Sequence, residues 1–356
     1  MSTWDLLAGM PLEIEELALD GRELKFSEEF SRLTTRVLLR GAGEEGVGED
    51  VVYDGLDQVA FQAEGTTLPL AGSWTLDSFS AHLGEIDLFQ GSPPERGQMS
   101  QDFRRWGLES AALDLALRQA GKPLHEVVGR EPRPVTFVVS TRLKPPGAAG
   151  PETADRVTGL LERYPKLRFK LDPTNDWTQG LCDELKATGA VDSLDLKGFY
   201  RGTPVDVRTD PELYRMCAET FPDAWLEDPD VNDETRPVLE PHWDRVTWDA
   251  PIHSVADIEA LERKPRTVNI KPSRFGRLEE LCNAYDHCDR EGIGAYGGGQ
   301  TELAEGRGQI QYLASLFHPD TPNDTAPGRY NMPQVPDGLP EPPLEPAPSA
   351  VGFRWA

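Results

Sequence analysis

Apolar and polar positions alternate regularly over the second half of the chain. After Pro132, short runs rich in β-branched and aromatic residues predict strands. They lie at residues 135–140, 167–171, 191–196, 224–228, 245–249, 267–271 and 293–297. Between them, segments such as WTQGLCDELKATG and RLEELCNAYDHCDREG carry apolar residues at helical spacing. About seven strand–helix repeats predict parallel strands that close into a barrel with helices outside. A doubly wound open sheet is the alternative, but no GxGxxG or Walker pattern follows the first strand.

The first part of the chain has a different pattern. Residues 11 to about 60 predict strands and turns, because the β-rich run TTRVLLRG precedes the glycine-rich, acidic GAGEEGVGEDVVYDG. From about Met99, FRRWGLESAALDLALRQAGK predicts a helix that ends at Gly121. Strands followed by a helix of this kind predict a separate α+β domain.

Composition and charge narrow the class of protein. The 356 residues are 38% hydrophobic and 27% charged, which is typical of a globular enzyme. A net charge of -25 disfavours nucleic acid and anionic membranes as partners. No stretch approaches the ~20 apolar residues of a membrane span, and no secretion signal is visible at the amino terminus. None of the four cysteines forms a CxxC pair, which disfavours zinc. We expect a cytoplasmic protein without nucleic-acid or membrane partners, and a homo-oligomer is compatible with the sequence.

Charged residues stand at the ends of the predicted barrel strands. The third, fourth and fifth strands carry Asp195, Glu227 and Asp249. The second and sixth carry Lys170 and Lys271. Successive members of this set are about one strand–helix unit apart. In a barrel, side chains from the carboxyl ends of several strands converge at one mouth, where the chemistry takes place.

Three carboxylates that converge in a low-dielectric mouth repel one another, and a divalent cation resolves the repulsion. Oxygen ligands from separate strands describe Mg²⁺, with Mn²⁺ as a substitute, better than zinc. A lysine within a strand is costly when it is buried and charged. One interpretation is that both lysines only pair with the carboxylates. The functional one is that burial and a nearby cation lower the pKa of a lysine toward neutrality, which makes it a general acid or base.

Several segments, taken together, resemble one known family. GVGED (46–50) resembles a turn in the capping domain of that family, and GLESAALDLALRQAGKPLHEVVG (107–129) resembles its helix leading into the barrel. KLRFKLDPTNDW (166–177) resembles a Lys-x-Lys strand, and the acids at the strand ends and the lysine of NIKP match metal ligands and an opposite lysine. The family is the enolase superfamily, in its mandelate racemase/muconate-lactonizing enzyme group, and specifically the muconate-lactonizing and o-succinylbenzoate-synthase-like branch.

The resemblance implies an α/β fold, a modified (β/α)7β barrel of the TIM type with an N-terminal α+β capping domain. We expect the cap over residues 1–128, the barrel over 129–320 and an arm over 321–356 that returns to the cap. The resemblance also implies that Lys170 and Lys271 face each other across the α-carbon of a small carboxylate substrate. One lysine would remove the α-proton, which gives an enediolate that Mg²⁺ stabilises.

The chain departs from the family pattern at several positions. The first lysine of the Lys-x-Lys pair is Arg168, which can serve only as a fixed charge beside Lys170 or toward substrate. Lys197 replaces a common asparagine and points either into the site or outward. The segment after the seventh strand offers further candidate substrate contacts, which are Gly298, Gln300 and Glu302. Glu302 can equally favour the amino terminus of the next helix.

The reaction type stays open at this level. A dehydratase or cycloisomerase fits the branch best, and a racemase or epimerase of the same superfamily is the alternative. A second interpretation is a catalytically inactive barrel that only binds metal. A barrel lyase that uses Lys271 as a Schiff base is a third.

Overall fold

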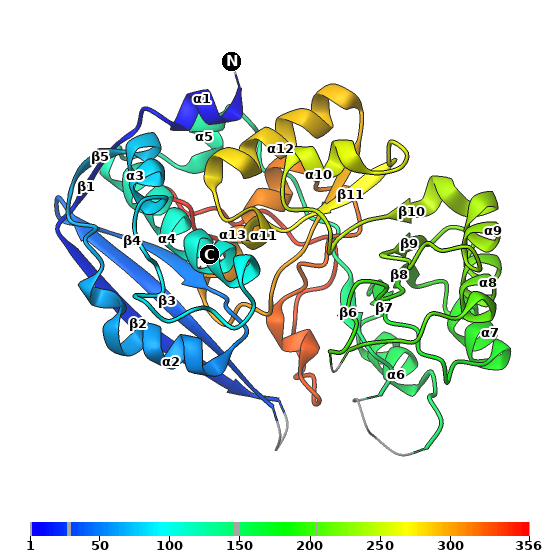
Figure 1. The fold of residues 1–356 in the computed structure, drawn as a ribbon. Coiled ribbons are helices and arrows are strands. Elements are labelled where there is room, and N and C mark those ends of the chain that lie inside the picture. The colour runs from blue at the N-terminus through cyan, green and yellow to red at the C-terminus, as the bar shows by residue number, and fades with distance from the viewer. Residues whose placement is uncertain (1, 27–29, 145–149, 204, 356) are drawn as a thin grey trace.

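The computed structural model describes residues 2–26, 30–144, 150–203 and 205–355. An N-terminal part built on antiparallel strands lies beside a second part built on parallel strands (Figure 1). The seven strands predicted after Pro132 are all present, and the α/β fold class with a barrel and a capping part is confirmed.

The N-terminal part contains two antiparallel sheets and a long helix. The helices and strands are α1 (Thr3–Leu7), β1 (Pro11–Ile14), β2 (Glu16–Lys25), β3 (Ser31–Gly41), β4 (Glu44–Asp50), α2 (Gly55–Glu64), η1 (Gly65–Thr67), β5 (Gly72–Thr75), α3 (Leu76–Leu83), α4 (Gln98–Gln119) and α5 (Leu124–Val128). Strand β3 lies between β2 and β4, and β1 pairs with β5. The strands predicted from residue 11 onward and the helix predicted from about Met99 are therefore confirmed. Residues 55–60 were expected as strand or turn but begin α2, because Asp54 caps a helix there by accepting from the backbone N–H of Asp57.

Helix α4 packs closely on β4, because two glycines of that strand leave space for the helix backbone. A Cβ at Gly46 would lie 2.3 Å from the carbonyl oxygen of Ala111, and one at Gly48 would lie 2.1 Å from that of Gly107. Both distances are far below van der Waals contact, so any side chain would push the helix away. The glycines of GVGED therefore set the spacing of helix and sheet.

The barrel part consists of short parallel strands with helices outside (Figure 1). The strands are β6 (Val139–Thr141), β7 (Phe169–Leu171), β8 (Val191–Asp195), β9 (Trp225–Glu227), β10 (Val246–Thr247), β11 (Thr267–Ile270) and β12 (Gly294–Gly297). The helices are α6 (Asp155–Arg163), α7 (Gln179–Ala187), α8 (Pro211–Thr220), α9 (Arg236–Leu239), α10 (Val255–Ala260), α11 (Pro272–Phe275), α12 (Leu278–Glu291) and α13 (Glu305–Phe317), with turns η2 (Glu240–Arg245) and η3 (Gly328–Asn331).

Strands β6 to β10 form one sheet, and β11 and β12 form a second. The N–H of Asn269 donates to the carbonyl oxygen of Trp248 at 2.9 Å, which joins β11 to the end of β10. On the other side, Asn323 bridges to Phe137 and Asp324 bridges to Gly298. The segment around Asn323 and Asp324 therefore takes the place of an eighth strand and closes the barrel.

Two buried charged residues of the N-terminal part hold the loop that follows β12. The guanidinium of Arg32 donates to the carbonyl oxygens of Val51 (2.6 Å) and Gln300 (2.9 Å). The carboxylate of Glu49 accepts from the backbone N–H groups of Leu303 (2.6 Å) and Gly306 (3.0 Å). The bonds to Glu49 satisfy backbone groups at the start of α13, whose N-cap residue, Ala304, provides no side-chain cap. The loop is thus fixed from the cap side.

The C-terminal arm lies against α4. The carboxylate of Asp114 accepts from the backbone N–H of Phe353 and from Nε of Arg354, both at 2.7 Å. The ring of Phe353 is fully buried and packs edge-on against Trp106. The arm therefore contributes side chains to the core of the N-terminal part.

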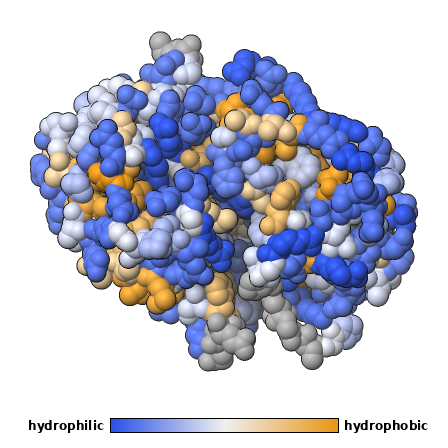
Figure 2. Space-filling model, in the orientation of Figure 1, coloured by the Kyte–Doolittle hydropathy of each residue, from blue (hydrophilic) through white to orange (hydrophobic). Residues whose placement is uncertain are grey.

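Hydrophilic residues cover most of the face shown in Figure 2, and apolar residues appear there in small groups. Among the described helices, none combines the length and apolar character needed to cross a membrane. The four cysteines are free and buried.

Candidate active site

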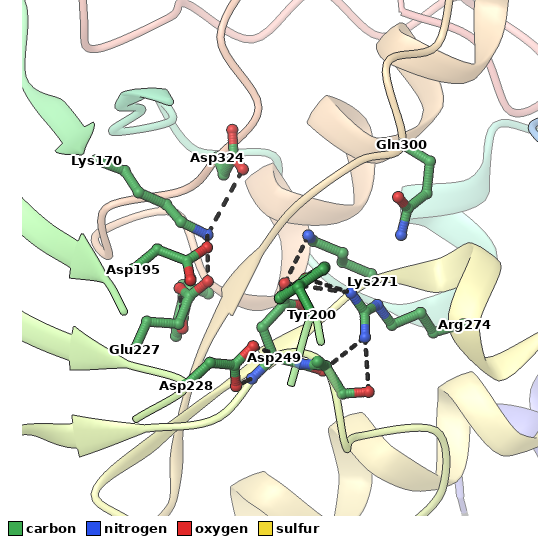
Figure 3. A network of polar contacts seen from close by, with 12 residues as sticks. Lys170, Asp195, Tyr200, Glu227, Asp228, Asp249, Lys271, Arg274, Gln300 and Asp324 are labelled. Carbon is green, nitrogen blue, oxygen red and sulfur yellow. Dashed lines mark hydrogen bonds and ion pairs between the residues drawn. The ribbon is translucent and has the colours of Figure 1, made fainter. Parts of the chain in front are cut away.

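The charged residues predicted from the strand ends lie together at one end of the barrel (Figure 3). Lys170 lies within β7, Asp195 and Glu227 end β8 and β9, Asp249 follows β10 and Lys271 follows β11. They meet because parallel strands bring their carboxyl ends to the same mouth. Lys170 is 2% exposed and Lys271 is 6% exposed, so this polar group is almost completely shielded from water.

Three buried carboxylates form the tightest group, and one of them was not predicted. Oxygens of Asp195, Glu227 and Asp228 all lie within 4.8 Å of one another. Asp228 follows Glu227 directly and has φ of 50°, in the left-handed region. At this φ the chain leaves the alternation of a strand, so two successive side chains can join the same group.

Asp249 stands beside this group and has cationic partners of its own. Nζ of Lys271 donates to Oδ2 of Asp249 at 2.7 Å, and the guanidinium of Arg274 lies 3.4 Å from the same oxygen. Asp228 accepts from the backbone N–H groups of Asp249 (2.8 Å) and Ala250 (2.9 Å). Asp228 thus holds the backbone that carries Asp249, while Oδ1 of Asp249 is buried and has no hydrogen-bond partner.

Lys170 contacts several carboxylates at once. Its Nζ donates to Glu227 and lies 3.3 Å from Oδ2 of Asp195 and 3.8 Å from Asp324. Burial alone lowers the pKa of Lys170, but the charges of Glu227 and Asp195 outweigh it and hold this pKa well above its ordinary value. This direction is opposite to the one expected from the sequence, because the ammonium group touches the carboxylates.

Crowding of negative charge is evident from Asp228. Burial, together with the charges of Asp249 and Asp195, raises the pKa of Asp228 to about 7. The backbone N–H groups of Asp249 and Ala250 oppose this shift but do not cancel it. Acids crowded together so closely favour a further cation among them.

The residues present fit a hard divalent cation. The donors are carboxylate oxygens without cysteine or histidine, which suits Mg²⁺ or Mn²⁺ rather than zinc. The unpartnered Oδ1 of Asp249 adds a buried acceptor beside the group. Such an atom is costly unless a cation or a donor satisfies it.

Two candidate substrate contacts point in different directions. Arg168 does not reach the group: its guanidinium pairs with Asp192 and donates to the carbonyl oxygen of Gly189. It therefore cannot act as the fixed charge expected beside Lys170. Lys197 turns inward at φ of 55°, and its Nζ donates to Oδ2 of Asp195 at 2.6 Å.

The loop after β12 contributes three candidates with different roles. A Cβ at Gly298 would lie 2.5 Å from Cε of Lys271, so this glycine leaves room for the lysine side chain. Gln300 is 5% exposed, extends toward the site in Figure 3, and its Nε2 has no partner. Glu302 instead accepts from the N–H of Gln300 at 2.6 Å and pairs with Arg307 at 3.0 Å, so it shapes the loop.

Four further residues belong to the polar network and were missed by sequence reasoning: Tyr200, Arg274, Tyr296 and Asp324. Arg274 lies on α11, three residues after Lys271, and Tyr200 lies shortly after β8, so both come from segments just beyond strand ends, which reach a barrel mouth. Asp324 lies in TPNDTAP, where no apolar run indicates a strand. Its place at the site follows from barrel closure alone.

Two family models together cover most of the chain. The N-terminal domain of a domain of unknown function, DUF8230, matches residues 5–127, and its C-terminal domain matches residues 131–332. The chain belongs to the DUF8230 family. The description of this family does not define a function.

This DUF8230 protein shares its fold with solved structures of the enolase superfamily. Muconate lactonizing enzyme from Pseudomonas putida aligns with a TM-score of 0.67 at 17% identity, over 96% of each chain. Dipeptide epimerase from Methylococcus capsulatus, complexed with Mg ion, aligns with a TM-score of 0.65 at 18% identity, over 90% of this chain and 92% of that one. The resemblance to this superfamily is therefore confirmed at the level of fold.

Curated relatives of the DUF8230 protein are similar over part of their length. o-Succinylbenzoate synthase from Geobacillus stearothermophilus is 26% identical over 227 residues, and that from Geobacillus kaustophilus is 27% identical over 233 residues. Each match spans 62% of this chain and 57% of the relative. These relatives are enzymes of the branch expected from the sequence.

Proposed function

We propose that this protein is an enzyme that removes the proton next to the carboxylate of a small substrate, with the help of a divalent cation. The placement of its two buried lysines carries this proposal. Lys170 belongs to β7 and Lys271 follows β11, so three strands separate them around the barrel. In Figure 3 both side chains extend toward the carboxylates from different sides.

Asp195, Glu227 and Asp249 would hold Mg²⁺, or Mn²⁺ as a substitute. Asp249 is preferred to Asp228 as the third ligand, because both oxygens of Asp228 already accept backbone N–H groups whereas Oδ1 of Asp249 has no partner. When bound, a dication offsets the negative charge that develops on a substrate carboxylate as its α-proton leaves.

The two lysines would handle the proton at Nζ. A neutral Nζ on one side accepts the proton from the α-carbon, and the ammonium on the other side holds charge or returns a proton. Both groups are buried, so water is excluded and the reacting atoms are held close together. Lys197 supplies a fixed cation for an anionic group of the substrate, and the unpartnered Nε2 of Gln300 supplies a hydrogen-bond donor.

Dehydration or cycloisomerisation is the reaction type that we favour. The curated relatives over 62% of the chain are o-succinylbenzoate synthases, and a muconate lactonizing enzyme shares the fold. Epimerisation is the second candidate, and a specific observation favours it: lysines on two sides of one carbon can remove a proton from one face and return it to the other. A dipeptide epimerase shares the fold as well.

Hydrogen–deuterium exchange tests the proposal. The protein would be incubated in deuterated buffer with MgCl₂ and a panel of hydroxy acids, unsaturated dicarboxylic acids and dipeptides, and deuterium at the α-carbon would be measured by mass spectrometry. Lys170→Met and Lys271→Met should each reduce exchange by at least about 100-fold, since general acid–base catalysis contributes roughly that much. Lys264→Met, at an exposed ion pair with Glu291, is the matched control.

The outcomes separate the candidates. Exchange that requires Mg²⁺, together with loss of water or ring closure, supports the favoured reaction, whereas exchange with inversion supports epimerisation. Exchange that persists in EDTA would mean that the reaction does not need the divalent cation. Absence of exchange with every acid in the panel would favour a retired barrel that binds metal without turnover.

A further inference from the structure

A tyrosine from β12 reaches across the inside of the barrel to the end of β9. The hydroxyl of Tyr296 donates to Oε2 of Glu227 at 2.5 Å, and the tyrosine is 3% exposed. Strand β12 pairs with β11, whereas Glu227 ends β9 in the other sheet. This hydrogen bond thus adds a side-chain link between the two sheets at the carboxylate group.

The proton of this hydroxyl is directed to Glu227 by its surroundings. The hydroxyl of Thr247 lies 3.3 Å from the Tyr296 oxygen and donates its own proton to the carbonyl oxygen of Thr267 at 2.8 Å. Because Thr247 donates its one proton to Thr267, it can only accept from Tyr296, and at 3.3 Å it is a more distant acceptor than Oε2 of Glu227 at 2.5 Å. The bond from Tyr296 is therefore a hydrogen bond to a charged acceptor, the stronger kind.

The two oxygens of Glu227 consequently have different partners. Oε1 contacts Nζ of Lys170, on the side of the carboxylate group, while Oε2 is held by Tyr296. The terminal torsion of a glutamate is broad and easily turned, so a carboxylate without such a bond samples several orientations. A fixed donor on Oε2 selects the orientation in which Oε1 faces the site.

We propose that Tyr296 is a positioning residue that presents Oε1 of Glu227 to the divalent cation of the proposed function, on which this inference rests. Tyr296 does not touch substrate or cation itself. Removal of a group that hydrogen-bonds to a metal ligand typically weakens metal binding 10- to 100-fold. The hydroxyl, rather than the ring, is the part of Tyr296 that matters for this role.

Tyr296→Phe tests the inference, because it removes the hydroxyl and keeps the ring. Mn²⁺ and Mg²⁺ affinities of the full-length protein would be measured by isothermal titration calorimetry, and the bound Mn²⁺ would be examined by electron paramagnetic resonance. We expect affinity about 10-fold weaker or more, and a changed Mn²⁺ spectrum. Tyr285→Phe is the matched control: this buried tyrosine lies on α12, its hydroxyl 3.4 Å from His318, and its loss should leave affinity unchanged.

A second variant protects the test against misfolding. Thr247→Val removes the alternative acceptor and leaves the Tyr296 hydroxyl on Glu227, so it should keep wild-type affinity; a loss equal to that of Tyr296→Phe would mean that altered packing, not the hydroxyl, weakens binding, and would overturn the inference. Equal affinities for wild type and Tyr296→Phe would overturn the inference and leave the proposed function standing. Failure of wild type to bind either ion would overturn both.

Discussion

Replacement of Lys170 by methionine should destabilise the protein and at the same time strengthen its hold on Mg²⁺. Lys170 is the buried cation in contact with Glu227, and its Nζ is 3.3 Å from Asp195. Methionine keeps much of the side-chain volume but removes the charge. Among the described residues, Glu227 is then buried without its cationic partner and Asp195 keeps only Lys197, so a bound dication would take over the role of Lys170.

The size of both effects follows from the structure. Removal of one partner of a buried ion pair costs about 3–5 kcal/mol. An unfolding entropy of about 2.1 cal/mol/K per residue, over 356 residues, converts this into a fall in Tm of about 4–7 °C. Mg²⁺ at about 100 times its Kd restores about 2.7 kcal/mol, or about 3–4 °C. Wild type should gain less at the same Mg²⁺ concentration, because the Lys170 ammonium competes for the same oxygens.

Differential scanning calorimetry in EDTA and in a series of MgCl₂ concentrations measures both effects. Lys264→Met is the control, because Lys264 is 57% exposed and its pair with Glu291 contributes about 1 kcal/mol or less. That variant should keep the Tm and the Mg²⁺ response of wild type. If Mg²⁺ raised the Tm of Lys170→Met no more than that of wild type, the carboxylates would not be the metal site and the reasoning would fail.

Two further substitutions probe the surroundings of the site and the C-terminal arm. Gly298→Ala should reduce α-carbon exchange at least about 10-fold, because its Cβ would lie 2.5 Å from Cε of Lys271 and displace the lysine; Gly159→Ala on α6, where a Cβ meets nothing within 4 Å, should keep wild-type exchange. Asp114→Asn should lower stability by about 2–4 kcal/mol and expose the arm to limited proteolysis, since one buried donor loses its acceptor, whereas the exposed Asp183→Asn should have neither effect.

The barrel and the charged residues at its strand ends could be predicted, because both follow from the local pattern of apolar and charged residues. Strand periodicity located the seven strands, and charged residues at strand ends must meet once the strands are parallel. Asp195, Glu227 and Asp249 therefore came within one site without knowledge of any distance.

Other parts depend on features that periodicity does not contain. The left-handed backbone at Asp228 adds a second acid next to Glu227, against the alternation of a strand. Arg168 lies two residues before Lys170, yet it pairs with Asp192 instead of joining the site. Tyr296 reaches Glu227 across the barrel, and such a contact requires the closed fold. Residue spacing shows neither the direction in which the backbone turns nor which side chains meet across the barrel.

The bonds from Arg32 and Glu49 to the loop after β12 limit how a substrate can reach the lysines. If the cap moved away from the barrel, Arg32 and Glu49 would both lose their hydrogen-bond partners in this loop. Even about 4 kcal/mol for that opening corresponds to about one molecule in a thousand at any moment. Cap and barrel therefore stay together, and a substrate would have to enter the barrel without separating them.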